Sequence, residues 1–155
     1  MPGRFEANVR ACEVLGVHYR PGLQALRPRD ARRIRVKHPR RLTGSLYLDS
    51  AFRGTLPEEP LWDYGIGYRH SGHEEESVHW VEVHPANDGE VAAVEAKLDW
   101  LKKWLRVSAP GVAAMRSRFV WISSGNTSLT PMAPGLRRLA EKGLRHVGGV
   151  YAIDA

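Results

Sequence analysis

Three side chains in the middle of the chain could carry out acid–base or metal chemistry: Asp63, Glu82 and His84. Glu82 and His84 lie two residues apart in the alternating segment 78–85, whose sequence is VHWVEVHP. Because side chains two apart in a strand point to the same face, Glu82 and His84 share a face with Trp80. A carboxylate beside an imidazole forms either a surface pair or half of a metal or acid–base site.

Asp63 begins one face of the segment 62–68, and the next two residues on that face are Gly65 and Gly67. Large apolar or aromatic side chains occupy the alternate positions. Glycines on one face of a strand often mark a place where another group approaches the backbone closely. We therefore expect Asp63 at the head of a nearly bare face, although an Asp at a strand end can also serve only as a cap.

The elements that must position these residues predict an α/β fold. Three successive strands joined by short loops favour a meander, and later strand–helix alternation favours crossover connections. We expect a single domain, 1–155, with a single mixed β-sheet, helices on both faces and the order α-β-β-β-α-β-α-β. The expected helices cover 4–15, 87–107 and 130–142, and the expected strands cover 42–49, 62–68, 78–85, 118–123 and 147–153.

The clearest helix follows the segment 78–85. Asn87 or Asp88 is suited to its N-cap, and the helix should end before Pro110. Its apolar stripe recurs at intervals of three and four residues, which predicts one buried face: Val91, Val94, Leu98, Leu101 and Leu105.

Charge is distributed unevenly along the chain. Residues 1–41 hold 11 Lys/Arg and 3 Asp/Glu, residues 42–99 hold 3 and 12, and residues 100–155 hold 9 and 2. Basic flanks suit a polyanion such as nucleic acid, and an acidic centre suits divalent cations. Residues 17–41 form a basic loop or arm that either contacts phosphates or pairs with the acidic middle of the chain. The candidate nucleic-acid-binding residues are Arg32, Arg33, Arg35, Lys37, Arg40 and Arg41.

Composition excludes several classes of protein. The single cysteine, Cys12, rules out an internal disulfide and any multi-cysteine zinc site. No apolar run approaches the ~20 residues of a membrane span. The N-terminus has no apolar signal core, so we expect a cytoplasmic protein with no membrane partner. A homodimer remains open.

The order of elements, with Asp63 and the Glu82-Val83-His84 triplet, resembles the PD-(D/E)xK nuclease-like superfamily. That family has a helix–three strands–helix–strand core, the restriction-endonuclease-like core. It places an Asp at the start of the second core strand, (D/E)-x-K on the third, and often an acid on the first helix. The resemblance covers about residues 4–123, and Glu13 or Glu6 would be the helical acid.

The resemblance implies metal-dependent hydrolysis of a nucleic-acid phosphodiester. Asp63 and Glu82 would bind Mg²⁺ or Mn²⁺, since two carboxylates and a substrate oxygen supply hard ligands. His84 stands where the family has Lys, and it would position or deprotonate water. A lysine that has moved to the following helix is the other source of that charge, and Lys97 is the candidate.

Other interpretations of the same residues remain open. A catalytically inactive member of this fold would bind nucleic acid or a protein partner. A transition-metal site could use His79 or His84 with neighbouring acids, and His70 and His73 lie in an acidic loop that reads more simply as a solvated turn. Two further features could contact nucleic acid but are also typical of core and turn residues: four tryptophans (80, 100, 104 and 121) and the loop 123–127.

Overall fold

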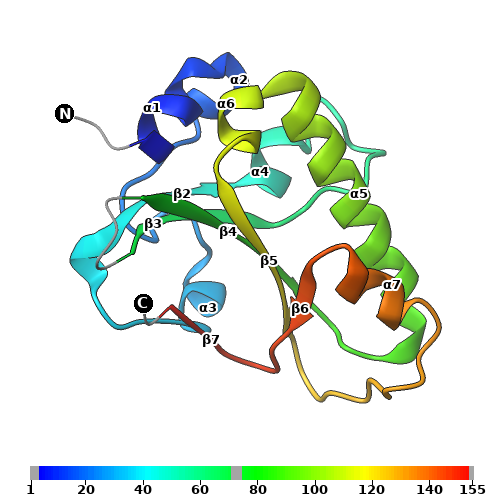
Figure 1. The fold of residues 1–155 in the computed structure, drawn as a ribbon. Coiled ribbons are helices and arrows are strands. Elements are labelled where there is room, and N and C mark those ends of the chain that lie inside the picture. Colours follow the sequence, from blue (N-terminus) through cyan, green and yellow to red (C-terminus); the bar gives the residue numbers. More distant parts are fainter. Residues whose placement is uncertain (1–3, 71–74, 154–155) are drawn as a thin grey trace.

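The computed structural model describes residues 4–70 and 75–153 (Figure 1). Its helices are α1 (Arg4–Ala11), α2 (Glu13–Gly16), α3 (Pro28–Ala31), α4 (Leu48–Phe52), α5 (Val91–Ser108), α6 (Pro110–Ala113) and α7 (Leu136–Glu141), with 3₁₀ turns η1 (Pro39–Arg41) and η2 (Asp88–Glu90). Its strands are β1 (Ile34–Val36), β2 (Leu42–Tyr47), β3 (Tyr64–Arg69), β4 (Glu76–His84), β5 (Arg116–Ser123), β6 (Leu144–His146) and β7 (Tyr151–Ile153). None of the helices described is long and apolar enough to cross a membrane.

The main sheet has five strands in the order β2-β3-β4-β5-β6. β2, β3 and β4 pair antiparallel, as expected of a meander. β5 pairs parallel with β4, and β6 pairs parallel with β5. Because parallel neighbours need a crossover, α5 connects β4 to β5 and α7 lies between β5 and β6. The predicted mixed α/β sheet is therefore confirmed.

One face of this sheet packs against α1, α5, α6 and α7 (Figure 1). The apolar stripe predicted for α5 is confirmed, because all five of its residues are buried. α1 is held to the sheet by its N-terminus, where the Glu76 carboxylate accepts hydrogen bonds from the backbone N–H groups of Arg4 and Phe5 at 2.7 and 3.0 Å. This contact explains why Glu76, on the first position of β4, is buried.

The opposite face is covered differently from the prediction of a single sheet. β1 and β7 form a separate two-stranded parallel sheet, and with the four-residue α3 they cover the second core. The expected strand 147–153 is interrupted at Gly148, whose φ of 83° turns the chain. β6, at 144–146, ends before the expected strand begins and lengthens the main sheet, and only 151–153 of the expected strand forms β7, which pairs with β1. The prediction of helices on both faces of the sheet is therefore only partly correct.

The basic segment 17–41 is folded against this second face. Asp30 is buried and accepts a hydrogen bond from the Tyr64 hydroxyl at 2.5 Å, and Arg27 pairs with it at 3.1 Å. Arg20 forms an isolated antiparallel bridge with Ser45 on β2. The segment therefore contributes α3, β1 and η1 to the fold, and its anchors are specific side chains.

Three expectations about local structure are wrong. β3 begins at Tyr64 rather than residue 62, and Trp62 packs in the core on the α5 side, while Tyr64 packs in the other core. The glycine face is not bare. A Cβ on Gly65 would lie 2.6 Å from the Trp80 ring, and one on Gly67 would lie 2.5 Å from the Phe5 ring. The glycines admit large side chains of the same chain. The helix expected at 130–142 is also shorter, because only α7 is helical.

Candidate active site

Asp63 and Glu82 meet where β3 begins and β4 ends, beneath α5. The two carboxylates are cross-braced by the backbone of the other strand. The backbone N–H of Asp63 donates to Glu82 Oε1 at 3.1 Å, and the backbone N–H of Val83 donates to Asp63 Oδ2 at 2.9 Å. The antiparallel pairing of β3 with β4, in which Tyr64 lies opposite Val81, sets this geometry. The two residues singled out from the sequence are therefore brought together.

Lys97 of α5 completes the cluster. Its Nζ lies 2.5 Å from Glu82 Oε2, and the Glu82 side chain is fully buried. Lys97 is one residue before Leu98 of the buried stripe, so its side chain reaches the strand from the edge of that stripe. Burial disfavours the charged form of Lys97, but the attraction of Glu82 outweighs it, and the pKa of Lys97 is raised.

His84 contacts the same Glu82 oxygen as Lys97 does. Its Nδ1 lies 3.3 Å from that oxygen, and its Nε2 lies 2.7 Å from Glu90 Oε2. The hydrogen bond to Glu82 raises the pKa of His84 above its usual value, against the effect of burial, and the bond to Glu90 adds to the rise. Glu82, His84 and Trp80 occupy the same face of β4, as the alternation predicted.

Asp63 is held in an environment that favours its neutral form. Burial raises its pKa to about 7, and the charge of Glu82 contributes in the same direction. The backbone bond from Val83 and the charge of Lys97 oppose the rise. A carboxyl group that titrates near neutral pH is a common property of functional sites. The cluster therefore has one carboxyl poised to gain or lose a proton and one ammonium beside its partner.

A third acid was missed from the sequence. The charge of Asp49, at the start of α4, contributes to the raised pKa of both Asp63 and Lys97, as the smallest of the effects acting on each. It is paired with Arg53 at 2.6 Å. Of the two helical acids expected from the sequence, Glu6 pairs instead with Arg10. Asp49 was missed because a tertiary contact positions it: Leu48, the residue after β2, donates its backbone N–H to Asp63 O at the start of β3.

The adjoining ends of β5 and β6 carry a second polar group. Ser123 lies opposite His84 in the parallel register, and its Oγ is hydrogen-bonded to His146 Nε2 at 2.6 Å. The loop 123–127 is the one that the sequence offered as a possible contact with nucleic acid. Its first two amides are already used, because Ser123 N–H donates to Gly148 O and Ser124 N–H donates to His84 O.

The arrangement offers hard oxygen donors rather than a complete metal cage. Within residues 4–70 and 75–153, no group of three or more His, Cys, Asp or Glu side chains is placed to hold a metal ion. Asp63 and Glu82 supply two carboxylates, a set that suits Mg²⁺ or Mn²⁺ when water and substrate oxygens fill the remaining positions. In donor type, though not in number, these residues match the divalent ion that the resemblance implies.

The transition-metal interpretation finds no support in the placement of His79. It lies on the opposite face of β4, where its Nδ1 is 2.6 Å from the Tyr151 hydroxyl. Burial lowers the pKa of His79 to about 3. His70 is hydrogen-bonded to Ser77, and His73 lies outside the described residues. His79 and His70 are therefore not brought together with His84.

The six candidate nucleic-acid-binding residues separate into two groups. Arg33 is structural, because its Nη1 donates to the carbonyl oxygens of Ser123 and Gly149 at 3.0 and 3.2 Å. Arg32 and Arg35 are exposed near α3 and on β1. Three line a surface cavity at the other end of the sheet from Asp63: Lys37, Arg40 and Arg41.

The tryptophans also divide by burial. Trp80 and Trp121 are fully buried core residues. Trp100 and Trp104 are partly exposed on α5 and lie 5.7 and 4.8 Å from the ring of Phe52.

No protein-family model, no curated protein and no solved structure matches this chain.

Proposed function

We propose that this protein is a metal-dependent hydrolase of nucleic-acid phosphodiesters. The observation that carries the proposal is the cross-braced pair Asp63 and Glu82 with the Lys97 ammonium 2.5 Å from Glu82. The three groups correspond to the Asp, the Glu and the displaced lysine of the PD-(D/E)xK pattern that the sequence resembles. The five-stranded mixed sheet is compatible with that resemblance.

Each residue has a role that its surroundings support. Asp63 and Glu82 would hold Mg²⁺ or Mn²⁺, which lowers the pKa of a bound water and neutralises charge on the phosphate. Lys97 replaces the family lysine, so His84 need not supply a permanent charge. His84, bonded to Glu82 and Glu90, is placed to orient Glu82, and these bonds raise its pKa and favour its protonated form.

The proposal predicts which carboxylates cleavage requires. Asp63→Asn/Glu82→Gln keeps acceptors for both backbone N–H groups, so we expect the fold to persist while Mg²⁺- or Mn²⁺-dependent cleavage disappears. Assays on duplex DNA, single-stranded DNA and RNA, with EDTA as a blank, measure it. The matched control is Glu58→Gln/Glu59→Gln, two exposed acids in the loop before Leu61. Equal cleavage by both double variants would remove the assignment.

A second candidate function is a catalytically inactive binding module. It is favoured by the complete burial of Glu82, whose Oε2 is already held by Lys97 and His84. This candidate predicts salt-sensitive nucleic-acid binding with no turnover in either metal. The same assays separate the two candidates, because only the hydrolase requires cleavage in the wild-type protein.

A further inference from the structure

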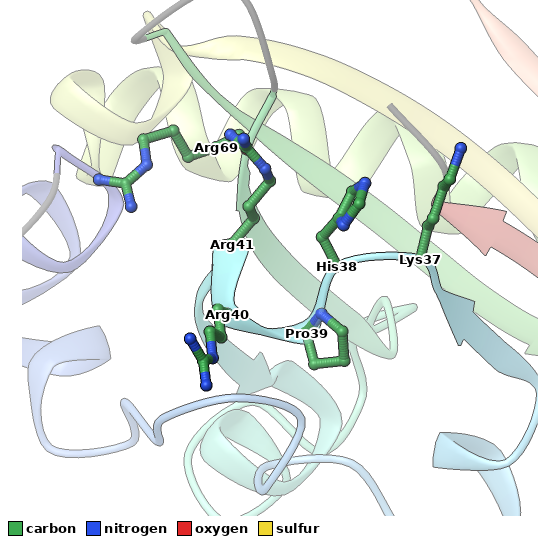
Figure 2. Close-up of a pocket in the computed structure, with 6 residues that line it drawn as sticks. All are labelled: Lys37, His38, Pro39, Arg40, Arg41 and Arg69. Carbon is green, nitrogen blue, oxygen red and sulfur yellow. The ribbon is translucent and has the colours of Figure 1, made fainter.

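A basic surface cavity of about 470 Å³ lies between η1 and the end of β3 (Figure 2). Lys37, His38 and Arg41 project to one side of their segment, and Arg69 of β3 lies beside Arg41. Arg41 Nη1 also donates to the Arg69 carbonyl oxygen at 3.5 Å. Six residues line the cavity, and all but Pro39 are basic: Lys37, His38, Pro39, Arg40, Arg41 and Arg69.

The cavity cations lack the carboxylate partners that some other arginines of the described chain have. Arg27, Arg53 and Arg138 each pair with a carboxylate of Asp30, Asp49 or Glu95. Within the described part of the chain, no carboxylate forms an ion pair with a residue that lines the cavity. Like charges gathered without a counter-charge create a positive potential that attracts an anion.

Basic side chains continue from the cavity along β2, an edge strand of the main sheet. Arg41 immediately precedes β2, and the exposed Arg20 is bridged to Ser45 in its middle. At the far end, the Arg27 guanidinium, which is paired with Asp30, lies over the ring of Tyr47 at 5.5 Å from its centroid. Tyr47 is followed by Leu48, whose N–H donates to Asp63 O. The edge of β2 thus connects the cavity to the carboxylates.

The length of β3 fixes the separation between the two sites. Arg69 and Asp63 lie at opposite ends of this strand, six residues apart, which is roughly 20 Å at about 3.3 Å per residue. A B-form duplex has one phosphate per strand about every 3.4 Å along its axis. The cavity therefore lies about six nucleotides from the carboxylates along a duplex.

We propose that Lys37, Arg41 and Arg69 bind a backbone phosphate about six nucleotides from the position of cleavage, with the polynucleotide following the edge of β2. This inference rests on the proposed function, because it takes the polyanion to be the substrate. A regularly spaced polyanion fits a line of separated cations better than a single small anion does. The ligand chemistry is a phosphodiester chain, which a duplex or a single strand can supply.

Fluorescence anisotropy in EDTA tests this inference without cleavage. The probes are a labelled duplex of about 20 base pairs and one of its single strands, a length that spans both sites. Arg41→Ala/Arg69→Ala should weaken binding about tenfold and reduce the slope of log affinity against log salt by about 2. The control is Arg106→Ala/Arg137→Ala, two exposed arginines on α5 and α7.

The outcomes separate this inference from the proposed function. An unchanged salt slope in Arg41→Ala/Arg69→Ala, or an equal loss in the control, would overturn the phosphate site whatever the cleavage assays give. A selective loss supports the site even if the protein proves inactive, since metal is absent from the measurement. The probe that shows the larger loss identifies whether the phosphates come from a duplex or a single strand.

Discussion

At the scale of single residues, the cluster around Glu82 shows what the sequence could and could not reveal. Asp63 and Glu82 were predicted together from alternation and strand order, and their carboxylates do contact each other's strands. Lys97 was predicted as the alternative source of the charge that the family lysine supplies. Lys97 contacts Glu82 because it lies beside the buried stripe of α5. Asp49 is positioned by the backbone contact of Leu48 with Asp63, which the periodicity of the sequence does not encode.

The titration of Asp63 predicts a pH dependence of stability. Its pKa is about 7 in the folded protein and about 4 in an unfolded chain, so the folded protein retains a proton between these values. The free energy of unfolding should therefore fall as pH rises across this window, by up to roughly 1.4 kcal/mol per pH unit. Asp63→Asn should remove this contribution, as measured by urea denaturation at several pH values. Parallel curves for the two proteins would contradict the assignment.

The pairing of Lys97 with Glu82 predicts a cost for losing the ammonium. Lys97→Met leaves a buried carboxylate without its nearest cation, so we expect a destabilisation of roughly 3 kcal/mol and loss of cleavage. Lys103→Met, on an exposed position of the same helix, should change stability little. Denaturant titration measures both. If Lys97→Met/Glu82→Gln is less stable than Lys97→Met alone, the interpretation of an uncompensated charge fails.

At the scale of elements, β3 explains why the sequence pattern was read incompletely. Alternating glycines were taken as an open face because they leave room beside the strand. The room is occupied by Trp80 from β4 and Phe5 from α1, which lie far away in sequence. Strand type and face were predictable from alternation, whereas the partner that fills a glycine face depends on tertiary packing.

That packing makes a quantitative prediction for Gly65. Its β-carbon would lie 2.6 Å from the Trp80 ring, a distance that forces a buried side chain to move. Gly65→Ala should destabilise the protein by roughly 2 kcal/mol, the usual cost of overpacking a core. Gly54→Ala has no atom within 4 Å of the new methyl group and should be close to neutral. Equal thermal or denaturant stability of the two variants would contradict this account of β3.

At the scale of the whole molecule, two different layers cover one sheet. The helical layer was largely predictable, because the apolar stripe of α5 and the order of the strands both indicate it. The second layer was not, since it joins the basic segment after α2 to the last strand across the full length of the chain. Parallel pairing of β1 with β7 leaves no local periodic signal, and a turn at Gly148 decides where β6 stops.

The distribution of charge also acquires a spatial meaning at this scale. The acidic middle of the sequence supplies Asp49, Asp63 and Glu82 to one end of β3, and the basic first third supplies Lys37 and Arg41 to the other. A polyanion held at the basic end would approach the carboxylates along the β2 edge. The sequence alone indicated both charges but not their separation.

Binding of Mn²⁺ followed by electron paramagnetic resonance at about pH 8 tests the central claim most directly, because Asp63 is then largely ionised. We expect the wild-type protein and Glu58→Gln/Glu59→Gln to bind Mn²⁺ in competition with Mg²⁺. Asp63→Asn/Glu82→Gln should lose this binding while circular dichroism shows an intact fold. Undiminished Mn²⁺ binding by Asp63→Asn/Glu82→Gln would contradict the assignment of a metal to these carboxylates.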